Sequence, residues 1–595
     1  MAGQAEDNFY IALSSNPIRF EPVSQVTNVF FDDTNLQVFA VRSGGAAGVV
    51  VKGADERKNI TFRMDDKGEV ISMKFSYDMK VLALQCSAKS VGKSTKIIGF
   101  VWTASNEIVF VTDFGIELYQ VQLEKKSLKM LKSYSFGINW YSWLPGSAVL
   151  LLSTGTLGNV LLPFYFKPGS MMKLTKFEVD LPAIPRPPKL SLLQHDVSMA
   201  VIYGKLYVIV LRHQPKPGGA VGAEIALYHI PRDNATRKAH ILKLDMSGRF
   251  AVNIVDNLVI VHHQASKTSM FFDIMLKGDT DGYVVTHQPV LSPLPIKPFK
   301  LKLQSVPTSS GVEVQEYTCE MFIDSPNWIA FQPNIIIDAK LGCMWYVQLR
   351  LSPLILMIPD KCLLVEFLLL RRDSKMVLLS VCKQILMPET QAKLTTISRV
   401  FNMLNKVYFN YLEAEVQAMA ADHPNVLQTP VIDQSDMYTH VFSIYAERTD
   451  IPYKFMVSVL IEYIRSLSQF QVPVQACLLL SLESVYPPAH QLSLDMLKRL
   501  GTANEQIVEV LLSKQQLLPA IRFLRSAGML DQISARKFLE AARLTGDKMI
   551  FYTVYKFFEQ RNIRTRGSAK FSPGEHCEQY VRHYEHLYGS SGVTA

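Results

Sequence analysis

The segment that comes closest to a catalytic motif is a near match to a phosphate-binding loop. It runs from Ser87 to Ser94, reads SAKSVGKS, and follows a predicted strand over 81–85. Such a loop needs glycines, whose backbone N–H groups surround the phosphates, and a helix that starts directly behind them. Here Ser87 replaces the first glycine, and the residues from Ile97 to Trp102 are typical of a strand. We therefore expect no nucleotide site and no nucleotide hydrolysis through Lys93.

Two shorter motifs resemble parts of active sites. The triplet Asp113-Phe114-Gly115 matches the magnesium-binding triplet of protein kinases, but the chain has no His-Arg-Asp catalytic loop. Because the triplet lies between two predicted strands, we expect a turn. His262 and His263 end another predicted strand, and no acidic residue or cysteine accompanies them to complete a metal site.

The best candidate for a metal site lies near the C-terminus, at His576, Cys577, His583 and His586. If this stretch is helical, His576, His583 and His586 share one face, and histidine and cysteine are the ligands that zinc prefers. Histidines on the exposed face of an amphipathic terminal helix are the alternative, and we favour it. We assign no catalytic residue, no cofactor-binding residue and no metal ligand, so the sequence predicts no enzyme and no cofactor.

Composition limits the class of protein that must position these residues. The chain has 595 residues, of which 48% are hydrophobic and 19% charged, so it is too apolar for disorder and too long for one core. The net charge of +9 is modest for this length, and we expect no nucleic-acid partner. Seven scattered cysteines form no C-x-x-C pair, which excludes a zinc ribbon and a disulfide framework.

The sequence shows neither a secretory leader nor a membrane span, so we expect a cytoplasmic protein. The first residues are acidic and lack the apolar run of a secretory leader. The most apolar stretch, from Leu354 to Leu370, is interrupted by Pro359-Asp360-Lys361 and by Glu366, which argues against a spanning helix. Any contact with a membrane is therefore expected to be peripheral.

The first two thirds of the chain have the pattern of a β-propeller. Residues ~25–385 hold about 28 short strand-like runs separated by turn residues, enough for about seven four-stranded blades. We therefore predict a divergent WD40-like β-propeller over 1–385, although no Trp-Asp dipeptide occurs. A pair of β-sandwiches is the alternative.

An internal repeat supports the propeller. Phe75, Trp102 and Trp143 occupy equivalent places in three strand–turn–strand segments. The 41 residues from Trp102 to Trp143 match one blade, but Phe75 and Trp102 are only 27 residues apart. One blade is therefore expected to be incomplete near 87–96.

Beyond Pro388 the hydrophobic period changes to that of helices. Residues 389–588 are predicted to form helical hairpins in series, an α-solenoid, with a single globular bundle as the alternative. Gly528 and Gly546 are expected to end helices, and Ser534 to begin one. Residues 589–595 are predicted to be a flexible tail.

The excess positive charge lies in the β part, because residues from 386 onward hold 21 basic and 20 acidic side chains. Lys125, Lys126, Lys129 and Lys132 lie close together within it. They could face acidic lipid or an acidic partner. We favour a solvated blade edge that lysines protect from pairing with other strands.

Several segments resemble one known family. They are QVFAVRSGGA (37–46), FRMDDKGEV (62–70), LLLSLESVYPPAHQLSLDMLKRL (478–500), FFEQRN (557–562) and PGEHCE (573–578). In these segments the chain is similar to the metazoan regulator of the Mon–Ccz complex, also called the Bulli or Mic-type family, and the resemblance covers nearly the whole chain. Relative to the family, the chain is shortened near Ser90–Lys96 and near Val474–Ala476.

The resemblance implies a non-catalytic third subunit of a guanine-nucleotide exchange factor. Its partners would be the Mon and Ccz subunits and, indirectly, the Rab GTPase of late endosomes. The family acts in endosome-to-lysosome traffic and autophagy, which implies a cytoplasmic protein held peripherally on late endosomes, lysosomes and autophagosomes. We expect the rigid propeller to supply the main docking face. A coat or tethering subunit of another trafficking complex, which would share a propeller followed by a solenoid, is the alternative.

Overall fold

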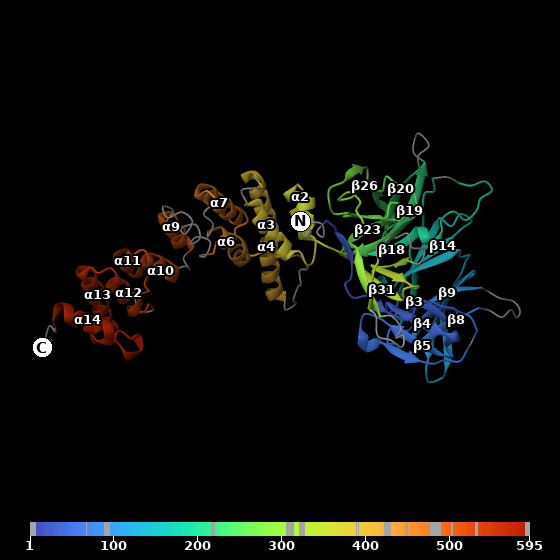
Figure 1. Ribbon diagram of the computed structural model, residues 1–595, viewed down its shortest axis with the longest axis horizontal. Coiled ribbons are helices and arrows are strands. Elements are labelled where there is room, and N and C mark those ends of the chain that lie inside the picture. The colour runs from blue at the N-terminus through green and yellow to red at the C-terminus, as the bar shows by residue number, and fades with distance from the viewer. Residues whose placement is uncertain are drawn as a thin grey trace. The chain divides into compact units, whose positions relative to one another are not determined.

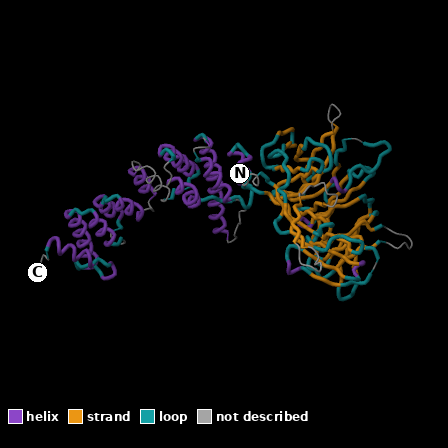
Figure 2. The backbone as a smooth tube through the Cα atoms, viewed as in Figure 1, coloured by secondary structure: helices purple, strands orange, loops and turns teal. Residues whose placement is uncertain are grey.

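The chain folds as two units, Met1–Ile358 and Pro359–Ala595 (Figure 1). Figure 2 shows that the strands belong to the first unit and the long helices to the second. The computed structural model describes residues 8–66, 68–87, 96–182, 184–215, 221–304, 314–319, 328–387, 390, 392–421, 430–446, 450–472, 474–475, 490–500, 504–529 and 533–589.

Six sheets of three or more strands form the six blades of a β-propeller. Three of them are the sheets β3 (Thr27–Asp32), β4 (Gln37–Arg42), β5 (Gly48–Lys52), β6 (Ile60–Phe62); β9 (Ile97–Ala104), β10 (Glu107–Thr112), β11 (Gly115–Gln122), β12 (Ser127–Ser135); and β13 (Trp140–Leu144), β14 (Val149–Thr154), β15 (Val160–Lys167), β16 (Ser170–Lys173), with β17 (Phe177–Glu178). The other three are β18 (Val197–Ile202), β19 (Lys205–Pro215), β20 (Val221–His229), β21 (Arg237–Lys243), with β25 (Asp279–Asp281) and β26 (Val284–His287); β22 (Phe250–Val255), β23 (Leu258–His263), β24 (Thr268–Phe272); and β1 (Ile11–Leu13), β2 (Ile18–Arg19), β29 (Trp328–Phe331), β30 (Ile335–Asp338), β31 (Cys343–Leu349).

The ring is closed by pairing between the two ends of the β unit. Strand β1 is antiparallel to β31, so that Ile11 lies opposite Leu349. The buried Tyr10 hydroxyl donates to the carbonyl oxygen of Ser269 at 2.7 Å, which ties the same end to β24. Closure of this kind leaves no open strand between the first and last blades.

Two hairpins stand outside the six larger sheets: β7 (Val70–Phe75) with β8 (Leu82–Cys86), and β27 (Phe299–Gln304) with β28 (Val314–Cys319). The first occupies the place of the predicted incomplete blade. The connection from Ser87 to Lys96 is too short for the second hairpin that the next sheet has between Gly115 and Ser135. Six blades therefore have three strands or more, and the two-stranded β7–β8 stands where the sequence predicts an incomplete blade.

The cores of the propeller are small clusters between successive sheets. Met73 and Phe75 of β7 pack with Phe39 of the preceding blade. On the other side of this hairpin, Ala83 packs against Phe100 and Trp102 of the following blade. As the repeat predicts, Phe75, Trp102 and Trp143 each lie on the first strand of a successive sheet, β7, β9 and β13.

The helical unit begins earlier than predicted. Its described helices, with α1 at the end of the β unit, are α1 (Leu354–Met357), α2 (Lys361–Leu369), α3 (Lys375–Ile385), α4 (Leu394–Ala421), α5 (Gln434–Met437), the π-helix η7 (Tyr438–Phe442), α6 (Ser443–Ala446), α7 (Tyr453–Gln469), α9 (His490–Leu500), α10 (Asn504–Ser513), α11 (Leu517–Ala527), α12 (Ala535–Leu544), α13 (Lys548–Arg566) and α14 (Glu578–Tyr588).

The predicted boundary at 385–389 is therefore wrong, and the division falls at Ile358–Pro359. The run of apolar residues after 354 has no period that separates a buried strand from a buried helix. The deciding local signal is Asp360, whose carboxylate accepts hydrogen bonds from the backbone N–H groups of Cys362 at 2.9 Å and Leu363 at 3.2 Å. This is the N-cap of α2, which interrupts the apolar stretch for a structural reason.

Consecutive helices pack on their neighbours in series. Helices α2, α3, α4 and α7 form one group, and α9 to α14 pack stepwise on one another. Gly528 ends α11 in the left-handed conformation with φ +69°, as predicted. Ser534 begins α12, although its side chain makes no capping hydrogen bond. None of the described helices combines the length and the apolar character that a bilayer span requires.

Some predictions lie outside the described residues. These are the segment 88–95 of the near-match phosphate loop, residues 473 and 476–477 of the shortened helical region, and residues 590–595 of the predicted tail.

Candidate functional site

The near match to a phosphate-binding loop lies between two strands. Strand β8 ends at Cys86, where the N–H of Ser87 donates to the carbonyl oxygen of Glu69 at 2.8 Å. Strand β9 begins at Ile97, so the described chain beyond the loop is a strand, as predicted. Because no helix begins there, the dipole and free N–H groups that hold phosphate in such loops are missing from Lys96 onward.

The triplet Asp113-Phe114-Gly115 joins β10 to β11, with Gly115 as the first residue of β11. The Asp113 carboxylate accepts a hydrogen bond from the N–H of Lys96 at 3.0 Å, and the Phe114 side chain is exposed. Gly115 has φ +152°, and a Cβ atom there would lie 2.0 Å from the carbonyl oxygen of Tyr134. The motif therefore serves backbone geometry, as the sequence predicts.

His262 and His263 both lie buried on β23, and protein groups occupy all four ring nitrogens. The ring of His262 lies 2.7 Å from the Ser269 hydroxyl and 3.1 Å from the side-chain oxygen of Asn253. The ring of His263 is bonded to the Ser266 hydroxyl at 2.7 Å and to the carbonyl oxygen of Ser247 at 3.0 Å. Burial lowers the pKa of His262 to about 4, so this ring is a neutral core group.

The C-terminal histidines do not share one helical face. Helix α14 begins at Glu578, and His576 precedes it in a left-handed conformation with φ +50°. Cys577 is buried, its thiol donates to the carbonyl oxygen of Glu575 at 3.3 Å, and burial raises its pKa to about 11. The His583 ring packs edge-on against Phe551, with centroids 4.9 Å apart. The described residues hold no group of three or more His, Cys, Asp or Glu side chains that could bind a metal ion.

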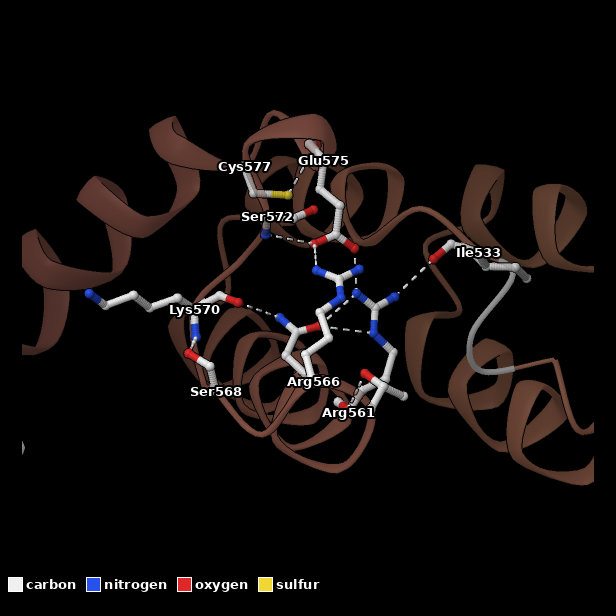
Figure 3. A network of polar contacts seen from close by, with 10 residues as sticks. Ile533, Arg561, Arg566, Ser568, Lys570, Ser572, Glu575 and Cys577 are labelled. Carbon is white, nitrogen blue, oxygen red and sulfur yellow. Dashed lines mark hydrogen bonds and ion pairs between the residues drawn. The ribbon is translucent and has the colours of Figure 1, made fainter.

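A buried ionic network organises this part of the chain instead (Figure 3). At its centre the Arg561 guanidinium, which is 6% exposed, is paired with the Glu575 carboxylate. Arg561 also donates to the side-chain oxygen of Asn562 at 2.9 Å and to the carbonyl oxygen of Ile533 at 3.0 Å. A single side chain of α13 therefore connects the start of α12 with the loop that precedes α14.

The Glu575 carboxylate receives two further hydrogen bonds around this pair. Arg566 donates to its second carboxylate oxygen at 3.3 Å, and the N–H of Ser572 does so at the same distance. Burial opposes the charge of Glu575, but the hydrogen bond and charge of Arg561 outweigh it and hold the carboxyl pKa below its ordinary value. The Arg561 guanidinium also stacks on Phe558, 4.9 Å from the ring centroid.

The sequence alone does not predict this network. Its two halves lie in the family-like segments FFEQRN and PGEHCE, and the structure brings them together through Arg561 and Glu575. An arginine on a predicted helix and a glutamate in a later Pro-Gly turn were the available signal. The contacts of Arg561 and Glu575 described here are all with groups of the protein, and their chemistry is that of a structural joint.

The lysines singled out in the β unit lie on an edge strand. Strand β12 is the last of its sheet and pairs only with β11, and the turn that joins the two contains Lys125 and Lys126. Lys129 and Lys132 follow on the strand, and all four side chains are exposed. This agrees with the predicted solvated blade edge.

The comparisons with known proteins cover both units. The N-terminal model of the family "Regulator of MON1-CCZ1 complex" matches residues 29–92 and 86–128, and the C-terminal model matches residues 371–476 and 475–574. The human protein "Regulator of MON1-CCZ1 complex" is 49% identical over 653 aligned residues, which cover 99% of each chain. The chain belongs to this family.

Two further relatives match the chain over very different lengths. The mouse protein of the same name is 48% identical over 99% of both chains. A homologue from Dictyostelium discoideum is 28% identical, over 41% of this chain and 24% of its own. Each family model matches in two parts, which meet at 86–92 and at 475–476, close to the two places where the chain is expected to be shortened. The human alignment is also longer than the 595 residues of this chain, as missing segments require.

Proposed function

We propose that this protein is a non-catalytic, regulatory subunit of the MON1-CCZ1 complex. The observation that carries the proposal is the 49% identity to the human regulator over 99% of both chains. The architecture fits, because a propeller and a series of helical hairpins offer rigid surfaces for other proteins. The histidine, cysteine and arginine groups described above are satisfied within the protein, which suits a scaffold.

We also propose the role of the complex in the cell from what the resemblance to this family implies. The complex would act as guanine-nucleotide exchange factor for the Rab GTPase of late endosomes, with MON1 and CCZ1 supplying the surface that opens the nucleotide site. This chain would support Rab activation, endosome-to-lysosome traffic and autophagy. It would be cytoplasmic and peripheral on late endosomes, lysosomes and autophagosomes, and would have no nucleic-acid partner.

Membership of the complex is tested by mixing the purified full-length chain with purified MON1-CCZ1 heterodimer. Size-exclusion chromatography with light scattering should show one species with the mass of one copy of each chain. Separate elution would overturn the proposal. Masses that grow with concentration would instead favour the alternative of a coat or tether that polymerises.

The exchange role needs a separate measurement. Release of a fluorescent nucleotide from the membrane-anchored late-endosomal Rab is followed with MON1-CCZ1 alone and with the three-chain complex. We expect the rate on vesicles to change when this chain is present, while a Rab of another compartment serves as the control. Equal rates would remove the exchange-supporting role and leave membership of the complex intact.

A further inference from the structure

Seven exposed lysines lie on two neighbouring blade edges of the propeller. Four belong to the β11–β12 hairpin and three to the strands β15 and β16 and the residues directly after them: Lys125, Lys126, Lys129, Lys132, Lys167, Lys173 and Lys176. Within the two segments 123–135 and 164–176, the only acidic residue is Glu124. These two short segments therefore hold a net charge of +6, against +9 for the whole chain.

The two edges are joined in space. The ammonium group of Lys132 on β12 donates to the carbonyl oxygen of Met171 on β16 at 3.0 Å. On the adjoining strands, Lys173 lies opposite Phe164 and Lys167 lies opposite Ser170. We call this surface, made of the seven lysines and the strands that carry them, the lysine edge.

Two acidic side chains lie at the lysine edge: Glu124 in its turn and the buried Glu107, which accepts a hydrogen bond from the N–H of Gly169 at 2.7 Å. None of its seven ammonium groups forms an ion pair with any described residue. Contacts with neighbouring rings are made by Lys132, 5.2 Å from the centroid of Tyr134, and by Lys167, 5.9 Å from that of Tyr165. A concentration of unpaired like charges is unfavourable for the isolated protein, and an anionic surface would relieve it.

Large apolar side chains stand among these lysines. They are between 44% and 58% exposed: Leu123, Leu128, Met130 and Met172. Leu128 and Met130 lie on the edge strand β12, Met172 lies on β16, and Leu123 lies in the turn before β12. Half-exposed leucine and methionine between lysines combine the two features by which peripheral surfaces bind lipid.

We propose that the lysine edge binds directly to a bilayer that contains anionic phospholipid. Two features favour a bilayer over an acidic protein. The seven cations on the two edges are lysines on flexible stems, which suit a diffuse negative surface, and the neighbouring guanidinium of Arg232 is stacked on Tyr165, 4.6 Å from the ring centroid. The cations also lie on the outer edges of two blades together with apolar side chains, which can enter the headgroup region.

The test uses the full-length chain alone, with vesicles of phosphatidylcholine with and without phosphatidylserine. Co-sedimentation should show binding only to the anionic vesicles, weakening as salt is added. A five-site variant keeps Lys132 and Lys167, which lie over neighbouring rings, and carries the changes Lys125→Gln, Lys126→Gln, Lys129→Gln, Lys173→Gln and Lys176→Gln. Because each lysine near an anionic surface adds to the attraction, we expect at least about a tenfold loss of affinity.

A matched control removes the same charge from exposed lysines elsewhere in the β unit: Lys189→Gln, Lys205→Gln, Lys243→Gln, Lys277→Gln and Lys340→Gln. The control should keep nearly all the binding, and equal losses in the two variants would overturn the proposal. A third variant with Met130→Ser and Met172→Ser keeps every charge. It should weaken binding to anionic vesicles without weakening binding to soluble polyglutamate.

The remaining outcomes also decide the question. Tight binding to polyglutamate together with no binding to anionic vesicles would assign the lysine edge to an acidic protein. Binding to neither would leave the lysines as protection against strand pairing and would overturn the proposal. MON1-CCZ1 is absent from this assay, so its result is independent of the proposed function.

Discussion

Strand β23 and helix α13 each bury a polar side chain, but the one on β23 is neutral and the one on α13 is charged. His262 on β23 is fully surrounded by neutral partners, the Ser269 hydroxyl and the Asn253 amide, and burial holds its pKa at about 4. Arg561 on α13 is charged and is matched by the Glu575 carboxylate. A group buried as a neutral species escapes the cost of desolvating a charge, whereas in a buried ion pair the attraction of the partner offsets that cost.

The difference predicts which conditions weaken each unit. Folding lowers the pKa of His262, so below pH 6.5 the unfolded chain binds a proton that the folded chain does not. The β unit therefore loses stability as pH falls below 6.5. Glu575 has a pKa lowered from 4.5, so its contribution is present above that pH and is lost only below it. Mild acid should therefore act on the β unit first.

The strongest test of the ion pair is Arg561→Ala. It leaves the mostly buried Glu575 with Arg566 as its remaining cation and removes the bond to the carbonyl oxygen of Ile533. Breaking a buried pair by removing one partner costs about 3 kcal/mol or more. Chemical denaturation of the full chain should report the loss, with hydrogen exchange locating it in α13 and residues 568–577.

Arg566→Ala is the matched control for that variant. Arg566 contacts the same carboxylate but is 43% exposed, so its loss should cost less than about 1 kcal/mol. Equal effects of the two variants would show that Arg561 is not the organising group of the network.

The second test is acid. Between pH 6.5 and 4, the free energy of unfolding of the β unit should fall by about 3 kcal/mol through His262. His240, whose pKa burial also lowers to about 4, should add to the fall. Hydrogen exchange measured at pH 7 and pH 5 should show increased opening of β22–β24 with little change at α13.

His262→Gln separates this effect from general acid damage. The amide can keep a hydrogen bond with Ser269 or Asn253 but does not titrate, so the pH dependence of exchange in β22–β24 should become flatter. An unchanged slope would assign the acid sensitivity to other groups.

The third test concerns backbone geometry in the β unit. Gly115→Ala places a Cβ atom against the carbonyl oxygen of Tyr134 at the start of β11. We expect a loss of about 2 kcal/mol, since the strained conformation and the clash both oppose the native turn. Gly137→Ala, at a nearby glycine where a Cβ atom meets nothing within 4 Å, should have a much smaller effect on the thermal midpoint.

The smallest expected effect concerns a surface pair of the helical unit. Lys537 and Glu509 lie 2.8 Å apart, but both side chains are more than half exposed. Lys537→Ala should change the free energy of unfolding by less than about 0.5 kcal/mol, in contrast to Arg561→Ala. A loss comparable with that of Arg561→Ala would mean that burial does not decide the strength of these pairs.

Local sequence signals predicted most of the architecture. Short strand runs with turn residues indicated the propeller, and Phe75, Trp102 and Trp143 marked equivalent first strands. The 27-residue spacing between Phe75 and Trp102 also predicted the blade that survives only as β7–β8. The apolar run after 354 was assigned to strands in error, because its period is ambiguous and its one cap, Asp360, was interpreted as an interruption.

The sequence alone determined most of the strands and helices and which family the chain resembles, because these depend on residues close together in the chain. Only the tertiary structure decided the fate of the chemically suggestive side chains. Whether His262 is a ligand or a core group depends on Asn253 and Ser269 from the two neighbouring strands. The partner of Arg561 is Glu575, beyond the end of its own helix. The charge state of a buried group is set by what folding brings beside it, and the spacing of residues along the chain does not contain that information.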